Sequence, residues 1–279
     1  MDQPTVDGIN TWFVSKAASE LGLKVAISGL GGDELFGGYS SFRSIPSWVR
    51  WMAGPSSILS LGQLLRRLFC KLHGEKLGLS PKIAGLVELG GTYPGAYLLR
   101  RGIFMPWELS EVLDPDFARD GLERLDPLKQ IARALTPDPV RPFARVATFE
   151  SSLYMRNQLL RDTDWTSMAH SLEVRVPLVD AELLQRIAPV TDGEYARFGK
   201  ELLASTLPQK LADRHKARIK TGFSTPIATW LRNAADRVNP GLRVPMSHWS
   251  RRWTCAVAEK FGLRCHSSRP PTYPLASVA

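Results

Sequence analysis

SGLGGDELFGGY, the stretch Ser28–Tyr39, decides the fold class of this chain. It directly follows Lys24–Ile27, a short apolar segment that predicts a buried strand, and the pattern over 10–20 predicts an amphipathic helix before that strand. The order of helix, short loop, apolar strand and glycine-rich loop is typical of an open α/β sheet. Such sheets bind ligands at the carboxyl ends of their strands, which is where this loop begins.

The rest of the sequence predicts helices rather than strands. Prolines and glycines separate the segments with helical spacing of apolar residues, which are 56–72, 82–89, 107–113, 143–160, 181–188, 198–206 and 226–237. Asp114–Pro142 is richer in proline and charge and predicts connections with one short helix. We therefore expect a mainly helical α/β chain with one or a few parallel strands over 1–262, followed by a disordered tail over 263–279.

Composition narrows the class of protein. The 279 residues are 44% hydrophobic, enough for a sizeable core, and the net charge of +9 favours anionic partners. The three cysteines, Cys70, Cys255 and Cys265, are too widely spaced to predict a disulfide framework or a zinc cluster. The first residues lack the pattern of a signal peptide, and no stretch approaches the roughly 18 apolar residues of a membrane span. These features predict a cytoplasmic protein with no membrane partner.

The glycine-rich loop differs from the two common phosphate-binding loops. A Walker loop carries a lysine after its last glycine, and a dinucleotide fingerprint carries a glycine where Glu34 stands. What remains is a strand end whose Ser28 hydroxyl and loop N–H groups could converge on a nucleotide or pyrophosphate. The carboxylates of Asp33 and Glu34 would repel phosphate directly. A Mg²⁺ ion between the carboxylates and the phosphate resolves this conflict. In a purely structural interpretation, Asp33 caps a helix that begins at Glu34.

Four ordered stretches carry a resemblance to the glutamine-dependent asparagine synthetase family, in its ATP-using synthetase domain. They are DQPTVDGINTWFVSKAA (2–18), SGLGGDELFGGY, DTDWTSMAHSLEVRVPLVD (162–180) and IKTGFSTPIATWLR (219–232). The resemblance extends from residue 1 to about 255. It implies part of an adenine-nucleotide-α-hydrolase-like (PP-loop ATPase) domain. The implied reaction uses ATP and Mg²⁺ to convert a carboxylate, aspartate or a related acid, into an acyl adenylate, which ammonia from glutamine then amidates.

The resemblance also implies roles for single residues. Lys220, at the position of the motif lysine, would stabilise the charged intermediates, and Glu173 would lie near the reacting centre as a base or as its orienting partner. Contacts to the carboxylate substrate are implied for Leu30 and Glu34. The resemblance implies that the nucleotide and its phosphates contact Ser28, Gly29, Gly31, Gly32 and Asp33. It also implies that Asp33 binds Mg²⁺.

Each of these polar residues also has a structural interpretation. Glu173 and Arg175, two residues apart, could form an ion pair, and Asp180 could cap a helix that begins near residue 181. His170 could act as an acid or base, although a structural histidine is the commoner case. The run Lys210–Lys220 could be a solvated basic face, and only the match to the family motif distinguishes its last lysine.

Leu30 departs from the family pattern. Asparagine-forming members typically carry an acidic residue at this position, and related β-lactam-forming members carry a tyrosine. A leucine can neither bind an amine nor accept a proton. Either another group does that work, or the substrate differs from aspartate.

Two further family elements are absent from the sequence. The adenine-nucleotide loop Ser-Gly-Gly-x-Asp-Ser is missing, and no catalytic cysteine follows Met1. Both elements, with the glutaminase domain, would lie upstream. We therefore expect the carboxyl-terminal piece of a longer synthetase, with a sheet reduced to one strand, inactive and of poor stability by itself.

The sequence leaves room for two functions that are not enzymatic. The chain could be a non-catalytic remnant that acts as a helical interaction module, and the resemblance is compatible with a homodimer. Nucleic-acid binding, prompted by the net charge of +9, is supported by no helix-turn-helix, zinc or RNA-binding signature.

Overall fold

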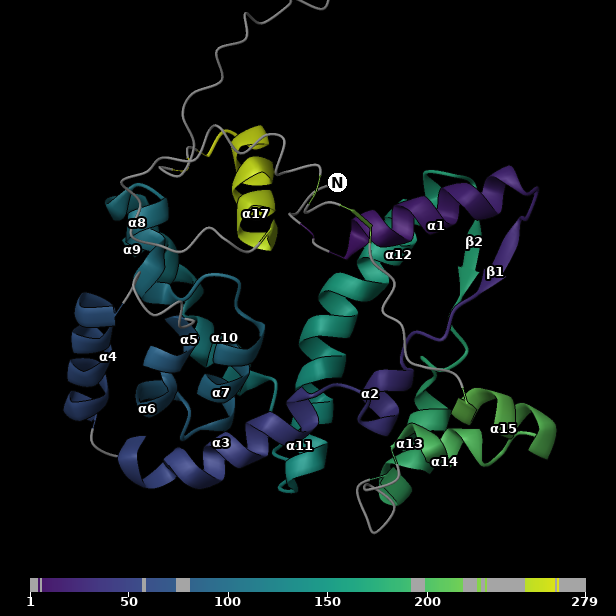
Figure 1. Cartoon of the computed structure of the whole chain (residues 1–279), viewed down its shortest axis with the longest axis horizontal. Helices are drawn as coiled ribbons and strands as arrows, with labels where there is room; N and C mark the ends of the chain where they lie inside the picture. Colours follow the sequence, from purple (N-terminus) through teal and green to yellow (C-terminus); the bar gives the residue numbers. More distant parts are fainter. Residues whose placement is uncertain are drawn as a thin grey trace, which may run out of the picture.

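The computed structural model of the chain is mainly helical with a small parallel sheet, in agreement with the expected α/β class. Figure 1 shows helices gathered on the left, the strands at the right, and a long central helix between them. The residues that it describes are 5, 7–56, 59–73, 81–191, 199–217, 225, 226, 229, 249–263 and 265. Among them, no helix is long and apolar enough to cross a membrane.

The sheet pairs two strands that are far apart in the sequence. β1 (Val25–Ile27) and β2 (Glu173–Arg175) are parallel, with Val25 opposite Glu173 and Ile27 opposite Arg175. Two parallel strands agree with the expected one or a few, and they are one more than the sheet reduced to one strand that the absent family elements suggested. The sequence hides β2 because charged residues flank Val174, so the segment lacks the apolar character that marks β1.

Helices pack against the sheet and against the glycine-rich loop. α1 (Gly8–Glu20) precedes β1 as predicted and packs against α12 (Leu160–Met168), which also contacts β2. The loop after β1 leads into α2 (Gly32–Phe36), which contacts α13 (Ala181–Thr191) and α14 (Lys200–Ala204). The loop therefore lies between the sheet and these two later helices.

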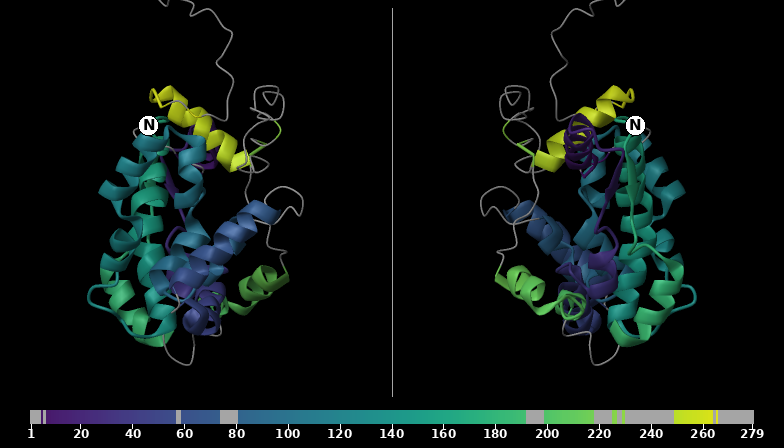
Figure 2. Two further views of the ribbon diagram at one scale, coloured as in Figure 1. Left: turned by 90° about the vertical axis from the view of Figure 1, so that its left-hand side faces the viewer. Right: turned by 90° about the vertical axis from the view of Figure 1, so that its right-hand side faces the viewer.

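One long helical rod joins the two sides of the molecule. It consists of α11 (Pro142–Phe149), the π-helical segment η2 (Glu150–Leu159) and α12, which follow each other without a break. Both side views show this rod, in teal, running along one flank (Figure 2). The sequence predicts its first part, 143–160, but not its continuation through α12.

The helical side has its own hydrophobic core. α3 (Ser41–Ser56), α7 (Tyr93–Arg101) and α11 enclose a buried cluster, whose members are Ile45, Ala96, Tyr97, Val146 and Phe149. The sequence did not predict α3 or α7, because α3 contains two prolines and α7 begins with Tyr-Pro-Gly. α7 forms nonetheless, because Thr92 Oγ1 caps it by accepting the Gly95 N–H at 3.2 Å.

Most of the other predicted helices are confirmed. The remaining elements are α4 (Leu59–His73), α5 (Pro81–Ala84), α6 (Leu86–Leu89), η1 (Pro106–Glu108), α8 (Leu109–Val112), α9 (Pro115–Leu125), α10 (Pro127–Arg133), α15 (Gln209–Ala217) and α17 (Trp249–Lys260). Asp114–Pro142 holds two helices, α9 and α10, rather than one. The predicted helix 226–237 and the tail 263–279 lie almost entirely outside the described residues.

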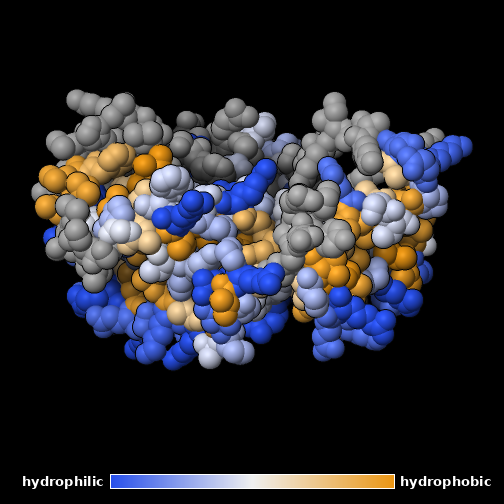
Figure 3. Space-filling view, turned by 90° about the horizontal axis from the view of Figure 1, so that it is seen from below, coloured by the Kyte–Doolittle hydropathy of each residue, from blue (hydrophilic) through white to orange (hydrophobic). Residues whose placement is uncertain are grey.

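Hydrophobic side chains are also exposed in several places. Figure 3 shows them on both sides of the lower face, beside α4 at the left and beside α13–α15 at the right. On α4 the exposed leucines are Leu64, Leu65 and Leu68. On α13–α15 and their connections they are Leu184, Leu203, Leu207 and Leu211.

Candidate functional site

The glycine-rich loop turns tightly against a second stretch of the chain. Gly31 has φ +93°, a conformation that favours glycine, and the Gly32 N–H donates to Gly29 O at 3.2 Å. A Cβ atom at Gly31 would lie 2.9 Å from Val179 Cγ2 and 3.1 Å from Leu178 O. The loop and the stretch 162–180, which are about 150 residues apart in the sequence, therefore meet where β1 ends.

The first residue of the loop braces its own turn. Ser28 N–H donates to Arg175 O at 2.8 Å and so extends the pairing with β2. Its hydroxyl oxygen accepts the Leu30 N–H at 3.3 Å. Gly29 is exposed, whereas Ser28 and Leu30 are half-buried. Of these predicted ligand-binding residues, Gly29 thus offers the most accessible backbone.

Asp33 does not cap the helix that follows the loop. α2 begins at Gly32, and its cap residue is Gly31, so Asp33 lies within the first turn. The prediction that Asp33 is a cap is therefore wrong. With only five residues, α2 has a weak dipole, and both Asp33 and Glu34 lie in its first turn. Asp33 is half-buried and its Oδ1 atom is shielded from solvent.

Glu34 points into the protein. Its side chain is buried, and Tyr39 Oη donates a hydrogen bond to Glu34 Oε1 at 2.9 Å. Burial raises the pKa of Glu34 above its ordinary value, although the hydrogen bonds from its own backbone N–H and from Tyr39 oppose the shift. Burial next to Glu34 likewise raises the pKa of Tyr39. The two adjacent carboxyl groups of the loop are thus in different environments.

A half-buried arginine connects this loop to the central rod. The Arg101 guanidinium lies 4.8 Å from the ring centroid of Tyr39 and 3.7 Å from that of Tyr154. It also donates to Glu150 Oε2 from Nη2 at 2.6 Å and from Nε at 3.0 Å. Glu150 is fully buried and also accepts from Ser41 Oγ. This network holds Tyr39, and through it Glu34, against the rod.

The rod presents polar side chains along one line at intervals of four residues. After Glu150 along the rod, Tyr154 Oη and Gln158 Nε2 both donate to Asp7 Oδ2, at 2.7 and 2.8 Å. One turn further, Asp162 accepts hydrogen bonds from Thr5 Oγ1 and from Trp165 Nε1. Burial raises the pKa of Asp162. The line therefore fastens the start of the described chain, within the stretch 2–18, to the rod.

Glu173 lies apart from the loop. It opens β2, whereas the loop follows the opposite, carboxyl end of β1. Its Oε1 atom accepts from Arg175 Nε at 2.8 Å, and both side chains are more than half exposed. The predicted ion pair is therefore confirmed, and a catalytic role for Glu173 stays a prediction. The second predicted catalytic residue, Lys220, lies outside the described residues.

Asp180 and His170 both make structural contacts. Asp180 Oδ1 accepts the Leu183 N–H at 2.7 Å, which confirms that Asp180 caps α13. The His170 ring lies edge-on to Trp12 with their centroids 4.6 Å apart. This contact fits a structural role for the histidine.

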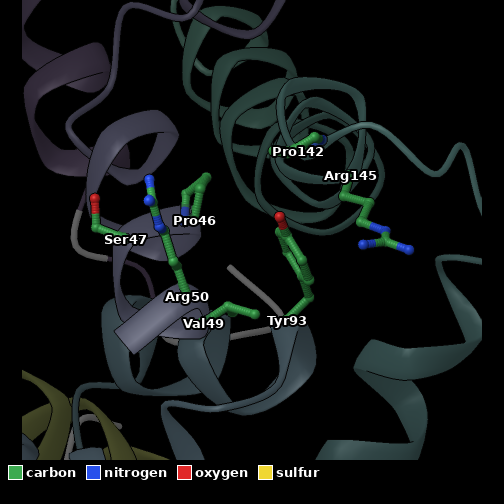
Figure 4. A pocket seen from close by; sticks show the side chains of 7 residues that line it. All are labelled: Pro46, Ser47, Val49, Arg50, Tyr93, Pro142 and Arg145. Atoms are coloured by element: carbon green, nitrogen blue, oxygen red, sulfur yellow. The ribbon is translucent and has the colours of Figure 1, made fainter. Parts of the chain in front are cut away.

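A surface pocket is lined by residues outside the loop. It has a volume of about 480 Å³, between α3, α7 and α11, and is lined by Pro46, Ser47, Val49, Arg50, Tyr93, Pro142 and Arg145. Figure 4 shows its two arginines on opposite sides of Tyr93. Arg145 is bound by Asp138, with Nη2 to Oδ2 at 2.6 Å. The two positive charges therefore do not converge on one ligand position.

Comparisons with known proteins agree with the motifs. Residues 1–246 match the family described as asparagine synthase. The chain is 29% identical over 239 residues to the putative asparagine synthetase (glutamine-hydrolyzing) of Mycobacterium tuberculosis strain H37Rv, which covers 83% of this chain and 34% of that protein. It is 28% identical over 251 residues to asparagine synthetase (glutamine-hydrolyzing) 1 of Bacillus subtilis strain 168. This match covers 83% of this chain and 35% of that protein. The chain spans about a third of the length of these relatives, and no solved structure matches it.

Proposed function

Because the chain belongs to the asparagine synthase family, we propose that it is the carboxyl-terminal part of the synthetase domain of a glutamine-dependent amidotransferase. One observation carries the proposal: Gly31 packs on Leu178 and Val179, so that two motif stretches meet at the carboxyl end of β1. Open α/β sheets bind their ligands at this end. We further propose that the domain has the PP-loop ATPase fold and that the remaining strands are in polypeptide outside this chain.

The proposed reaction has two steps. A carboxylate oxygen of the substrate attacks the α-phosphorus of ATP, and pyrophosphate leaves as the acyl adenylate forms. Ammonia released from glutamine then attacks the acyl carbon, AMP leaves, and the nitrogen gives up a proton. Both steps develop negative charge on phosphate oxygens, so they need donors and cations fixed near those oxygens.

The residues of the chain would divide this work. The backbone of Gly29, with the loop that follows it, would contact the nucleotide, and Lys220 would stabilise the charge that develops on the phosphates. The exposed position of Gly29 and the tight turn at Gly31 support this assignment. Glu34 would act indirectly, since it is buried against Tyr39 and away from solvent.

Asp33 fits a Mg²⁺ ion that is shared with the substrate. Within the described ranges, no group of three histidine, cysteine or acidic residues could hold a metal ion by itself. Glu34 is buried and bonded to Tyr39, whereas Asp33 is half-buried in the first turn of α2. Mg²⁺ is commonly held by one or two carboxylates together with substrate phosphates. When bound, it would neutralise charge on the departing pyrophosphate.

A release assay for pyrophosphate tests this function. The chain is mixed with the Mycobacterium tuberculosis relative from which the matched region has been deleted, and ATP, Mg²⁺, an ammonium salt and single carboxylic acids are added. We expect pyrophosphate release that depends on one carboxylate and is lost in Asp33→Asn and Lys220→Ala. Asp120→Asn, an exposed substitution on α9, is the matched control and should retain the activity.

A second candidate function follows from Leu30. This residue provides no proton acceptor at the position where asparagine-forming members carry an acid, so the chain could be a non-catalytic helical interaction module. Binding of the chain to the truncated relative without any ATP binding or pyrophosphate release would favour this second candidate.

A further inference from the structure

The outward side of α3 carries a basic residue and an exposed tryptophan. On the inner side, Ile45 lies in the core of the helical side, and Trp48 and Val49 pack against it. Arg50 and Trp51 are exposed, Trp51 to 71%. The guanidinium of Arg50 lies 5.9 Å from the ring centroid of Trp51. A large aromatic side chain next to a cation therefore faces solvent.

The outward side of α4 is apolar, with an arginine among its leucines. Its inner side is held by Arg66, which pairs with Glu88 and lies with its guanidinium 4.5 Å from the ring centroid of Trp107. The side chains on either side of Arg66 in the sequence are exposed, and they are Leu64, Leu65, Arg67 and Leu68. Figure 3 shows exposed hydrophobic side chains beside this helix.

α3 and α4 meet at one corner of the molecule. The two helices contact each other, and Figure 1 shows them along its lower and left-hand margins. Apolar and basic side chains are thus exposed on neighbouring helices. We name the following exposed side chains the α3–α4 surface: Arg50, Trp51, Leu64, Leu65, Arg67 and Leu68.

The charge of this part of the chain has one sign. Residues 41–73, which span both helices, include five lysines and arginines and no acidic residue, so they carry +5 of the net charge of +9. The other exposed apolar region, on α13–α15, differs in this respect. Residues 181–217 include six basic and five acidic residues, which gives a net charge of +1. Apolar exposure and strong positive charge therefore coincide at the α3–α4 surface.

This combination fits an anionic lipid interface better than other anionic partners. At such an interface, tryptophan and leucine side chains enter the boundary between headgroups and acyl chains, and arginine and lysine stay near the lipid phosphates. Nucleic acid would use the positive charge but not the leucines, because its affinity comes from neutralised phosphates. A second copy of the chain would bring two positively charged surfaces together.

We propose that the α3–α4 surface docks reversibly on an anionic membrane surface. Trp51 and the leucines of α4 enter the headgroup region, and Arg50 and Arg67 bind lipid phosphates. Such a contact differs from a membrane span, and the expectation of no membrane partner concerned spans and signal peptides. The inference goes beyond the proposed function and does not depend on it.

Vesicle flotation tests this docking, because bound protein rises with the vesicles whereas aggregated protein sediments. The full chain is mixed either with vesicles of equal parts phosphatidylcholine and phosphatidylglycerol or with vesicles of phosphatidylcholine alone. We expect flotation with the anionic vesicles and little with the neutral ones. High salt should weaken it, because salt screens the attraction between the arginines and the lipid phosphates.

Two pairs of variants locate the contact on the chain. Arg67→Gln should weaken binding to the anionic vesicles about fivefold, the effect of one basic residue near such a surface. Arg186→Gln removes the same charge from α13 and should bind as the unmodified chain does. Leu68→Ser should also weaken binding, whereas Leu184→Ser, at a leucine of similar exposure on α13, should not. Circular dichroism checks that each variant is folded.

Three results would overturn the proposal. The first is a chain that does not float with the anionic vesicles. The second is equal flotation with both kinds of vesicle at every salt concentration, which would show apolar adhesion without recognition of charge. The third is binding that Arg67→Gln and Leu68→Ser leave unchanged, which would assign lipid binding to another part of the chain. Pyrophosphate release plays no part in this test, so the proposed reaction and the docking surface can fail separately.

Discussion

Arg101 neutralises Glu150, which is fully buried, through two hydrogen bonds at 2.6 and 3.0 Å. The pair joins α7 to the central rod, and the same guanidinium lies over the rings of Tyr39 and Tyr154. Its role is therefore structural and extends to the glycine-rich loop, because Tyr39 also holds Glu34.

Replacing Arg101 should strongly destabilise the fold. Arg101→Met leaves the carboxylate of Glu150 buried without its counter-charge, and we expect the free energy of unfolding to fall by about 3–5 kcal/mol. Urea denaturation followed by circular dichroism measures this loss.

Two variants control for the removal of an arginine. Arg186→Met breaks an exposed pair with Glu182, which should cost less than about 1 kcal/mol. The double variant Arg101→Met/Glu150→Gln should be more stable than Arg101→Met alone, because no buried charge remains. Equal losses for Arg101→Met and Arg186→Met would contradict the assignment.

The turn of the loop depends on glycine at position 31. Gly31→Ala places a Cβ atom against Val179 and Leu178 at φ +93°, so we expect the free energy of unfolding to fall by about 1–2 kcal/mol or more. Gly121→Ala is a matched control on α9, where no atom lies within 4 Å of the added carbon. It should raise stability by about 0.5–1 kcal/mol, since alanine favours helix. If Gly31→Ala raised the free energy of unfolding as Gly121→Ala does, the loop would be free to rearrange and the prediction would be wrong.

Local features of this site could be predicted from sequence, and distant pairings could not. β1, the glycine-rich loop and the short helix after it lie within a dozen residues, so spacing alone indicates them. β2 depends on pairing with β1, and its alternating charges give no apolar signal. Arg101 and Glu150 are 49 residues apart, and only the packing of α7 on the rod brings them together.

One overlooked signal does exist in the sequence. Glu150, Tyr154, Gln158 and Asp162 recur every four residues inside an otherwise helical pattern, which places them on one face. Polar side chains repeated along one face of a helix predict hydrogen-bond partners on the elements packed against that face. In the structure these partners are Asp7, Arg101 and Thr5. The placement of Glu173 away from the loop had no comparable signal, because it depends on the position of β2.

The pH dependence of stability should report the burial of Glu34. Its pKa is raised in the folded protein, so between the ordinary value of 4.5 and the folded value the native state binds more protons than the unfolded state. Stability contributed by this group is therefore present at low pH and is lost as pH rises through that window. Glu34→Gln removes this loss, and its stability relative to the unmodified chain should increase from pH 4 to pH 7.

A second variant isolates the contribution of Tyr39 to the pKa of Glu34. The hydrogen bond from Tyr39 lowers the pKa that burial raises, so Tyr39→Phe should widen the window toward higher pH. Urea denaturation at several pH values measures both variants. A flat difference between Glu34→Gln and the unmodified chain would show that the carboxyl group is solvated.

Asp138 provides the opposite case at the surface. Hydrogen bonds from Arg145 and from the Val140 N–H hold the pKa of Asp138 at about 2, below its ordinary value of 3.8. The sign is the reverse of that for Glu34. The stability that Asp138 contributes is present above its ordinary pKa and is lost as pH falls through its pKa in the folded protein.

Carbon-detected NMR titration of the Asp138 carboxyl group should give a pKa near 2 in the unmodified chain. In Arg145→Met the pKa should move toward 3.8, although the Val140 N–H keeps it somewhat below. An unchanged value would mean that the backbone hydrogen bond alone lowers the pKa and that the pair with Arg145 adds nothing in solution.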